Sequence, residues 1–431
     1  MSVVVMKFGG SSVGNKEKIE NVAKKIVKKK KKGKDVAVVV SAMGDSTDEL
    51  IDLAYSINPD PPEREFDMLL STGEQVSSAL LTMAINNLGV DAVSLTATQV
   101  GIRTDNVHKK ARIISIDEER LNKELQDGKV VIVAGFQGVN GEFDITTLGR
   151  GGSDTSAVAL AKALDASVCE IYTDVDGVYT ADPRIVKNAR KLKEVAYDEM
   201  LELSSLGSKV LQARSVECAR LHNISLHVRS SFNDREGTYV QEGYDSMEIK
   251  NPLIRGVCSD KEIAKVAVKG VPDKPGVSYK VFGELAKENI NVDMIVQSLQ
   301  KEKGINDILF TVKLEDVQKT REVLESIHEF EIEDIMIRED VAKVSIVGAG
   351  IAQNPEVYPS MFGALGNEGI NIEIISTSEI RISCLIDETR LEDAINAVHE
   401  KFNLGAEKDN EISTNMEDLN KDEGNSITMG G

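Results

Sequence analysis

The chain has 431 residues, of which 41% are hydrophobic and 28% are charged, so it is long enough for two or three globular domains. Its formal net charge of −20 argues against nonspecific nucleic-acid binding, because affinity for a phosphate backbone comes from clustered Lys and Arg. The apolar start ends at Lys7, too early for a signal peptide or a membrane span, so we expect a cytoplasmic protein without membrane contact.

The first 230 residues alternate short β-branched runs with segments of helix length. Continuous apolar runs indicate strands that are buried on both faces, as in a mainly parallel sheet sandwiched by helices. We therefore expect an α/β catalytic domain over residues 1–230. The expected strands are residues 3–8, 35–41, 91–95, 129–134 and 168–173, and the expected helices include residues 17–27 and 155–164.

Two features that resemble binding sites are better explained as structure. Residues 28–32 and Lys34 form a basic run after an expected helix, where cations suit the helix dipole. The four cysteines are far apart and form no CxxC pair, which predicts reduced thiols and no zinc site. We expect no metal site built from protein ligands alone.

A first glycine-rich turn, residues 7–12 (Lys-Phe-Gly-Gly-Ser-Ser), lies between the first expected strand and a helix. Paired glycines let the backbone approach a ligand, and N–H groups at a helix start can bind phosphate oxygens. Lys7 would add a positive charge for a transferring phosphoryl group. The plain structural alternative is a tight turn with a surface lysine.

A second glycine-rich turn, residues 147–154 (Thr-Leu-Gly-Arg-Gly-Gly-Ser-Asp), also precedes an expected helix. Arg150 offers a planar fork suited to a carboxylate, and Asp154 is placed to orient nearby lysines rather than to act as a base. Residues 173–184 form a polar loop that can border a nucleotide. No Walker, GxGxxG or protein-kinase motif is present, and the acidic spacing of an EF-hand is missing.

The C-terminal part contains an internal repeat. Residues 264–270 (Ala-Lys-Val-Ala-Val-Lys-Gly) return as residues 342–348, and residues 288–293 return as residues 368–373. Such a long period predicts two small α+β modules, at residues 261–340 and 341–405. Residues 231–260 are expected to be a linker, and the acidic residues 406–431 a disordered tail.

Six motifs in order resemble those of the aspartokinases, within the amino-acid kinase family. They are residues 7–12, 40–44 (Val-Ser-Ala-Met-Gly) with Thr47, 71–74 (Ser-Thr-Gly-Glu), 147–154, 173–179 (Thr-Asp-Val-Asp-Gly-Val-Tyr) and 181–184 (Ala-Asp-Pro-Arg). The two repeats resemble the paired, ferredoxin-like ACT domains of those enzymes. The resemblance implies transfer of the ATP γ-phosphoryl group to the β-carboxylate of L-aspartate, the first step of lysine, threonine and methionine biosynthesis.

The resemblance also assigns residues to three sites. ATP is expected to contact Lys7, Gly9, Gly10, Ser11, Ser41, Thr173, Asp174, Tyr179, Asp182, Pro183, Arg184, Lys209 and Val210. Aspartate is expected at Thr47, Glu74, Arg150, Gly151, Gly152, Ser153 and Asp154, with Lys7, Asp154 and Lys209 in catalytic roles. An amino-acid effector is expected at Asp273, Gly276, Asn291, Val292, Asp293 and Gln297, and in the second repeat at Asn371, Ile372, Ser378 and Glu379.

The expected reaction needs no general base. A carboxylate with a reference pKa near 4 is already ionised at neutral pH, so the site must chiefly bring two anions together and neutralise their charge. Lys7, Lys209 and Mg²⁺ that arrives with ATP are expected to do this. Within the substrate site, Glu74 suits the ammonium group of aspartate and Arg150 its α-carboxylate.

Regulation and assembly are expected by resemblance. Lysine, threonine or both would inhibit through the ACT domains, and the chain would form a homo-oligomer, or a heterotetramer with a regulatory chain started at Met247. No homoserine dehydrogenase module is recognised, so we expect a monofunctional enzyme. Two alternatives stay open: a kinase for glutamate, acetylglutamate or a nucleotide monophosphate, and an amino-acid sensor with an inactive kinase domain.

Overall fold

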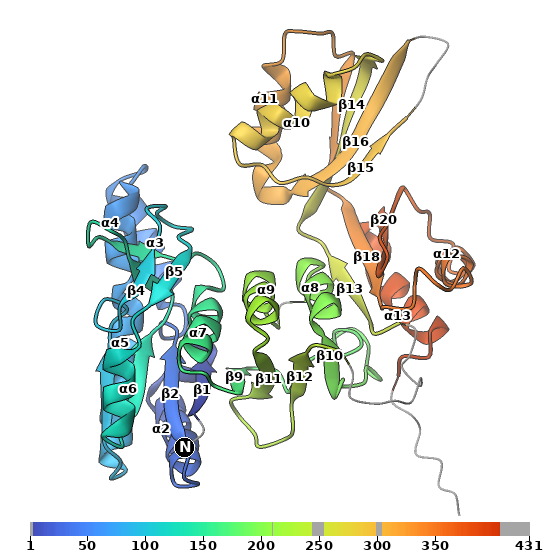
Figure 1. Ribbon diagram of the computed structural model, residues 1–431. Helices are drawn as coiled ribbons and strands as arrows, with labels where there is room; N and C mark the ends of the chain where they lie inside the picture. The colour runs from blue at the N-terminus through green and yellow to red at the C-terminus, as the bar shows by residue number, and fades with distance from the viewer. Residues whose placement is uncertain (1–2, 209, 244–253, 299–303, 406–431) are drawn as a thin grey trace, which may run out of the picture.

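The computed structural model describes residues 3–208, 210–243, 254–298 and 304–405, arranged as an N-terminal α/β domain and two smaller modules (Figure 1). Met247, the expected internal start of a separate regulatory chain, and the expected tail at residues 406–431 lie outside the described residues. Within the described ranges, no helix is long and apolar enough to cross a membrane.

The N-terminal domain is built on an eight-stranded sheet in the order β10-β12-β11-β9-β1-β2-β6-β3. Every neighbouring pair is parallel except β11 and β12, so the predicted mainly parallel sheet is confirmed. The strands are β1 (Val3–Phe8), β2 (Asp35–Val40), β3 (Ala92–Leu95), β6 (Val130–Ala134), β9 (Val168–Thr173), β10 (Glu194–Ala196), β11 (Ser225–Ser230) and β12 (Thr238–Gln241).

Helices cover both faces of this sheet, because alternate residues of each buried strand point to opposite sides. On β1, Val4 and Met6 pack in the core that includes α2 and α5, whereas Val5 packs in the core that includes α6, α7, α8 and α9. The helices are α1 (Gly10–Val13), α2 (Lys16–Lys30), α5 (Thr72–Asn87), α6 (Glu119–Gln126), α7 (Gly152–Ala163), α8 (Tyr197–Ser205) and α9 (Ala213–His222).

Helix α2 extends through the first part of the basic run, and several of its lysines have acidic partners. Lys29 Nζ lies 2.7 Å from Glu170 Oε1, and Lys28 Nζ lies 2.9 Å from Asp234 Oδ2. These ion pairs fasten the last turn of α2 to the sheet and to the loop after β11.

A small second sheet, in the order β5-β4-β7-β8, lies beside helices α3 and α4 in Figure 1. Its strands have only three or four residues, which is too short for a periodic signal, so the sequence did not predict them. The elements are α3 (Ser46–Ile57), α4 (Glu63–Leu70), β4 (Ile102–Thr104), β5 (Ile113–Ile116), β7 (Gln137–Val139) and β8 (Ile145–Thr147).

The first C-terminal module is a complete βαββαβ unit with the antiparallel strand order β15-β16-β14-β17. Its elements are β14 (Ile263–Pro272), α10 (Val277–Lys287), β15 (Asp293–Gln297), β16 (Ile305–Lys313), the 3₁₀ turn η1 (Leu314–Asp316), α11 (Val317–Glu325) and β17 (Asp334–Arg338).

The second module has the order β13-β18-β20-β19, and its first strand comes from before the first module. Strand β13 pairs antiparallel with β18, the position that β17 takes beside β14 in the first module. The segment expected to be a linker, residues 231–260, thus contains two strands: β12 of the N-terminal sheet and β13 of the second module. The elements are β13 (Gly256–Asp260), β18 (Val341–Val347), α12 (Val357–Asn367), β19 (Ile374–Thr377), β20 (Arg381–Asp387), the 3₁₀ turn η2 (Glu388–Arg390) and α13 (Leu391–Lys401).

Candidate active site

The first glycine-rich turn meets the loop after β2 at the carboxyl ends of two parallel strands. Ser41 N donates to Phe8 O at 3.1 Å, and Gly44 N donates to Gly10 O at 3.1 Å. A Cβ atom at Gly10 would lie 2.8 Å from Ala42 O, so only glycine permits this approach. Gly9 lies in the same turn, Ser11 is exposed on α1, and Thr47 is half-buried in the first turn of α3.

Lys7 and Asp154 bring the two glycine-rich turns together. Lys7 Nζ lies 2.6 Å from Asp154 Oδ1, and both side chains are largely buried. Lys7 is on β1, whereas Asp154 is in the first turn of α7. The carboxylate therefore fixes the ammonium group at the end of the central strand, which is the orienting role that the sequence suggests for Asp154.

Helix α7 begins at Gly152, three residues earlier than the sequence predicted. The turn before Thr155 is already helical, since Thr155 N donates to Gly151 O at 3.1 Å. Ser153 and Asp154 are thus buried helical residues, while Arg150 is exposed in the preceding turn. This arrangement leaves the Arg150 guanidinium accessible to a ligand.

Glu74 is a buried carboxylate at the start of α5. Its Oε1 accepts from Ala42 N at 3.1 Å, whereas its buried Oε2 has no hydrogen-bond partner among the described residues. Burial raises the pKa of Glu74 to about 7, although hydrogen bonds from backbone N–H groups, including that of Ala42, oppose the shift. An ammonium group would supply the missing partner of Oε2.

A cavity of about 610 Å³ is lined by six of the thirteen residues expected to contact ATP. Asp182 and Arg184 also form an ion pair with each other, at 2.6 Å. Lys209 lies outside the described residues, and Thr173 lies at the end of β9, where its hydroxyl donates to Asp174 Oδ1 at 3.0 Å. The expected residues that line the cavity are Asp174, Tyr179, Asp182, Pro183, Arg184 and Val210.

The same cavity is lined by residues that the sequence did not predict. Val257, Cys258 and Ser259 reach it from β13, and Ile395 reaches it from α13. They belong to the second module, far along the chain and outside every motif, so no local signal could have identified them. The second module thus forms part of the wall of the candidate nucleotide site.

Thr180 connects this cavity's loop to the second module. Its Oγ1 lies 3.0 Å from His399 Nε2 of α13 and donates to Leu404 O at 3.1 Å. The carbonyl oxygen of Thr180 also accepts from Val257 N of β13 at 2.8 Å. Helix α13 and strand β13 of the second module therefore both contact Thr180.

The residues expected to bind an effector are spread over both modules, and some already have protein partners. Asp273 accepts from Asn306 Nδ2 at 2.8 Å, and Asp293 forms an ion pair with Lys343 at 2.8 Å. Three of the expected residues are exposed: Asn291, Gln297 and Asn371. Gly276 directly precedes α10 and has a left-handed backbone conformation, with φ +98°. Val292, Ile372 and Ser378 are half-buried, and Glu379 is exposed.

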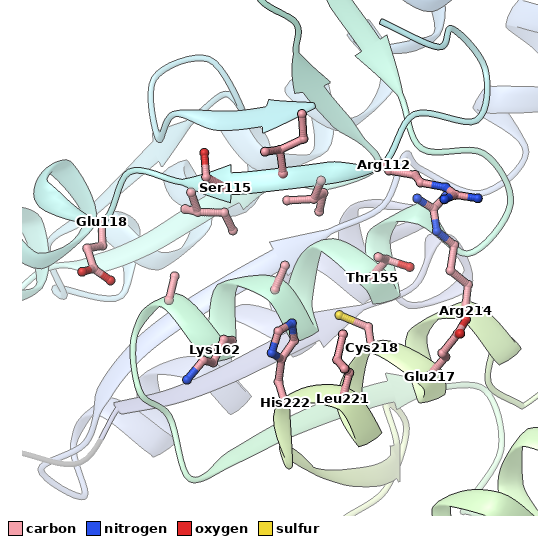
Figure 2. A pocket seen from close by; sticks show the side chains of 15 residues that line it. Arg112, Ser115, Glu118, Thr155, Lys162, Arg214, Glu217, Cys218, Leu221 and His222 are labelled. Atoms are coloured by element: carbon pink, nitrogen blue, oxygen red, sulfur yellow. The ribbon is translucent and has the colours of Figure 1, made fainter. Parts of the chain in front are cut away.

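A larger cavity, of about 810 Å³, lies away from these residues, between β5, α7 and α9 (Figure 2). Figure 2 shows Arg112 and Arg214 side by side at one end and Lys162 and His222 at the other. None of the residues expected to bind ATP, aspartate or an effector lines it. In the part of the chain that the structure describes, no group of three or more His, Cys, Asp or Glu side chains could hold a metal ion.

Comparison with protein families gives the class. A model described as the amino acid kinase family matches residues 2–230, and two models described as ACT domains match residues 266–332 and 344–402. The parallel sheet, the two glycine-rich turns and the two C-terminal repeats thus belong to an amino acid kinase with two ACT domains.

Individual relatives narrow this class. The aspartokinase of Corynebacterium glutamicum is 51% identical over 410 residues, covering 94% of this chain and 97% of its own, and the aspartate kinase of Pseudomonas putida is 50% identical over 408 residues, covering 94% and 98%. E. coli aspartokinase III in complex with aspartate and ADP (R-state) superposes with a TM-score of 0.77 at 26% identity, over 93% of this chain and 99% of that one. The chain belongs to the aspartokinases, which are ATP-dependent kinases, and the family resemblance seen in its motifs is confirmed.

Proposed function

We propose that the enzyme transfers the γ-phosphoryl group of ATP to the β-carboxylate of L-aspartate, giving 4-phospho-L-aspartate. The observation that carries this proposal is the buried Lys7–Asp154 pair, which places a fixed cation where the two glycine-rich turns meet. One E. coli relative binds aspartate with ADP, which supports the choice of substrates. We assign the reaction to the cytoplasm and to the start of lysine, threonine and methionine biosynthesis.

Each part of aspartate has a partner in this proposal. The ammonium group binds the free Oε2 of Glu74, and the α-carboxylate binds the exposed fork of Arg150. The β-carboxylate is then left to approach the γ-phosphate beside Lys7. Because this nucleophile is ionised at neutral pH, the chain has to align two anions and does not have to remove a proton.

ATP occupies the 610 Å³ cavity in the proposal, with its phosphates directed toward Lys7 and Lys209. Mg²⁺ arriving with ATP would be held mainly by phosphate oxygens and water, and Asp174, which lines the cavity, would be the carboxylate on its outer side. When bound, Mg²⁺ neutralises part of the charge on the phosphoryl oxygens.

Feedback inhibition by lysine, threonine or both is proposed through the ACT domains. A lysine complex of E. coli aspartokinase III (T-state) superposes on 93% of this chain with a TM-score of 0.73 at 25% identity. The contacts of Thr180 and β13 supply a direct physical route from the second ACT domain to the nucleotide loop. We also propose that the enzyme assembles as a homo-oligomer, or as a heterotetramer with a regulatory chain.

A hydroxylamine assay tests the reaction, because hydroxylamine converts an acyl phosphate into a hydroxamate, whose complex with iron(III) is coloured. We expect ATP-dependent hydroxamate from aspartate and none from glutamate. Adding lysine or threonine should suppress the signal. Product from glutamate at a similar rate, or no product with either acceptor, would contradict the proposed substrate.

A further inference from the structure

Asp67 is a fully buried carboxylate that contacts two separate chain segments. It lies on α4 and accepts from Thr147 Oγ1 at 2.6 Å and from Thr147 N at 3.0 Å. It also accepts from Lys109 N at 3.1 Å and lies 2.7 Å from His108 Nδ1. Asp67 therefore joins the start of the second glycine-rich turn to the loop before β5.

Arg214 joins the same two segments through another pair of atoms. It lies on α9, donates from Nη1 to Leu148 O at 2.6 Å and donates from Nη2 to Ala111 O at 2.6 Å. Figure 2 shows its side chain at the end of the 810 Å³ cavity, beside Arg112. A carboxylate and a guanidinium on different helices thus tie residues 108–111 to residues 147–148.

We call Asp67 and Arg214, with the two segments that they join, the clamp. Direct contacts between the backbones of the two segments complete it. Ala111 N donates to Thr147 O at 2.9 Å. Gly149 has φ +77°, and a Cβ atom there would lie 2.8 Å from Lys109 O, so the turn packs against the loop without space for a side chain. The turn is therefore fixed immediately before Arg150.

We propose that Asp67 and Arg214 are positioning residues that set the affinity for aspartate by fixing the turn that carries Arg150. The inference rests on the proposed function, in which Arg150 binds the α-carboxylate. Neither residue contacts the substrate in this proposal. Loss of the clamp lets the turn move, and misplacement of a binding group by about 1 Å can cost up to about a hundredfold in rate.

Thr147→Val tests the clamp with little change in shape, because it removes the hydroxyl that donates to Asp67. Thr146→Val is a matched control: Thr146 is the neighbouring residue of β8, equally buried, and its hydroxyl lies 2.6 Å from that of Thr104 instead. We expect Thr147→Val to raise the KM for aspartate on the order of tenfold and to leave the KM for ATP within about twofold. Thr147→Ser should restore the normal value.

Arg214→Lys provides a second test, since a lysine keeps the charge but cannot donate to both carbonyl groups with a planar fork. Arg220→Lys on the same helix is its control, because Arg220 forms an exposed ion pair with Asp198. Arg214→Lys should raise the KM for aspartate, and Arg220→Lys should not. Calorimetric titration of aspartate without ATP should show the same loss of affinity.

Equal KM values for aspartate in Thr147→Val and Thr146→Val would overturn the clamp. Arg150→Ala separates this failure from failure of the proposed function. If Arg150→Ala raises the KM for aspartate while Thr147→Val does not, only the clamp is wrong. If neither changes it, Arg150 does not bind the substrate and both ideas fail.

Discussion

Lys343 of the second ACT domain forms an ion pair with Asp293 of the first, with Nζ 2.8 Å from Oδ2. The repeat makes a second, equivalent pair: Lys265 of the first domain lies 2.9 Å from Glu373 of the second. Lys265 and Lys343 occupy the same place in the two repeats, as do Asp293 and Glu373. The two domains therefore face each other with approximate twofold symmetry inside one chain.

An apolar cluster accompanies these pairs. Ile263 and Met294 from the first domain pack with Val341, Ile374 and Leu385 from the second. Burial alone would raise the pKa of Asp293, but the charge of Lys343 reverses the effect and holds this pKa below its usual value. The carboxylate expected to bind an effector is thus already engaged in joining the two domains.

Lys343→Ala should weaken feedback inhibition without reducing basal turnover. The substitution removes a nearly buried cation and frees Asp293, so the relative position of the ACT domains is less firmly fixed. We expect the lysine or threonine concentration for half inhibition to rise at least about fivefold, the size of a typical coupling between sites. Lys319→Ala, which breaks an exposed ion pair with Glu288 inside the first domain, is the control. Unchanged inhibition in Lys343→Ala would show that the pair has no regulatory part.

Thr180→Val should weaken ATP binding although Thr180 is not expected to touch the nucleotide. The substitution removes the hydroxyl that contacts His399 and Leu404 and therefore loosens the loop of Tyr179 and Asp182. We expect the KM for ATP to rise about fivefold to tenfold, as for loss of buried hydrogen bonds of about 1 kcal/mol each. The KM for aspartate should change less. Equal changes in both constants would indicate general loosening of the enzyme instead.

Much of the fold follows from the sequence because it depends on local patterns. The five long apolar runs become β1, β2, β3, β6 and β9, since a strand buried on both faces must be apolar along its length. The role of β13 did not follow. Its pairing with β18 depends on a partner more than 80 residues away, and nothing within Gly256–Asp260 distinguishes an edge strand from a linker.

The candidate site likewise contains residues that the sequence predicts and residues that it does not predict. Lys7 and Asp154 could be predicted from two glycine-rich motifs, because each motif has its own local signature. Cys258, Ile395 and Arg214 could not, since they reach their positions only through tertiary packing. A motif search therefore finds the groups that we propose bind phosphate and carboxylate but misses the elements that hold them in place.

Lys7→Ala should reduce kcat by a factor of roughly 10² to 10³, the usual cost of losing one group that stabilises transition-state charge. The fold should stay intact, which circular dichroism and the unfolding temperature would show. Lys29→Ala is the matched control, because Lys29 is also largely buried and ion-paired, with Glu170 at 2.7 Å. Near-normal turnover in Lys7→Ala, or an equal loss in Lys29→Ala, would exclude a specific role for Lys7.

Glu74 should make aspartate binding depend on pH near neutrality. Its carboxyl has a pKa of about 7 in the folded enzyme, above its ordinary value of 4.5, because the group is buried. Only the ionised form attracts the substrate ammonium, so kcat/KM for aspartate should rise as the pH increases through about 7. In Glu74→Gln the value should be low and should lose this rise, whereas the pH dependence of kcat/KM for ATP should be the same in both enzymes.

The effect of Glu74 on stability has the opposite sign to its effect on binding. Between pH 4.5 and 7 the folded enzyme binds more protons at Glu74 than the unfolded chain does, so this group makes the enzyme less stable as the pH rises. Glu74→Gln should therefore gain stability relative to the wild type above pH 7, as measured by chemical denaturation at pH 5 and pH 8. A pH profile for aspartate that is the same in Glu74→Gln and in the wild type would assign the ammonium contact to another residue.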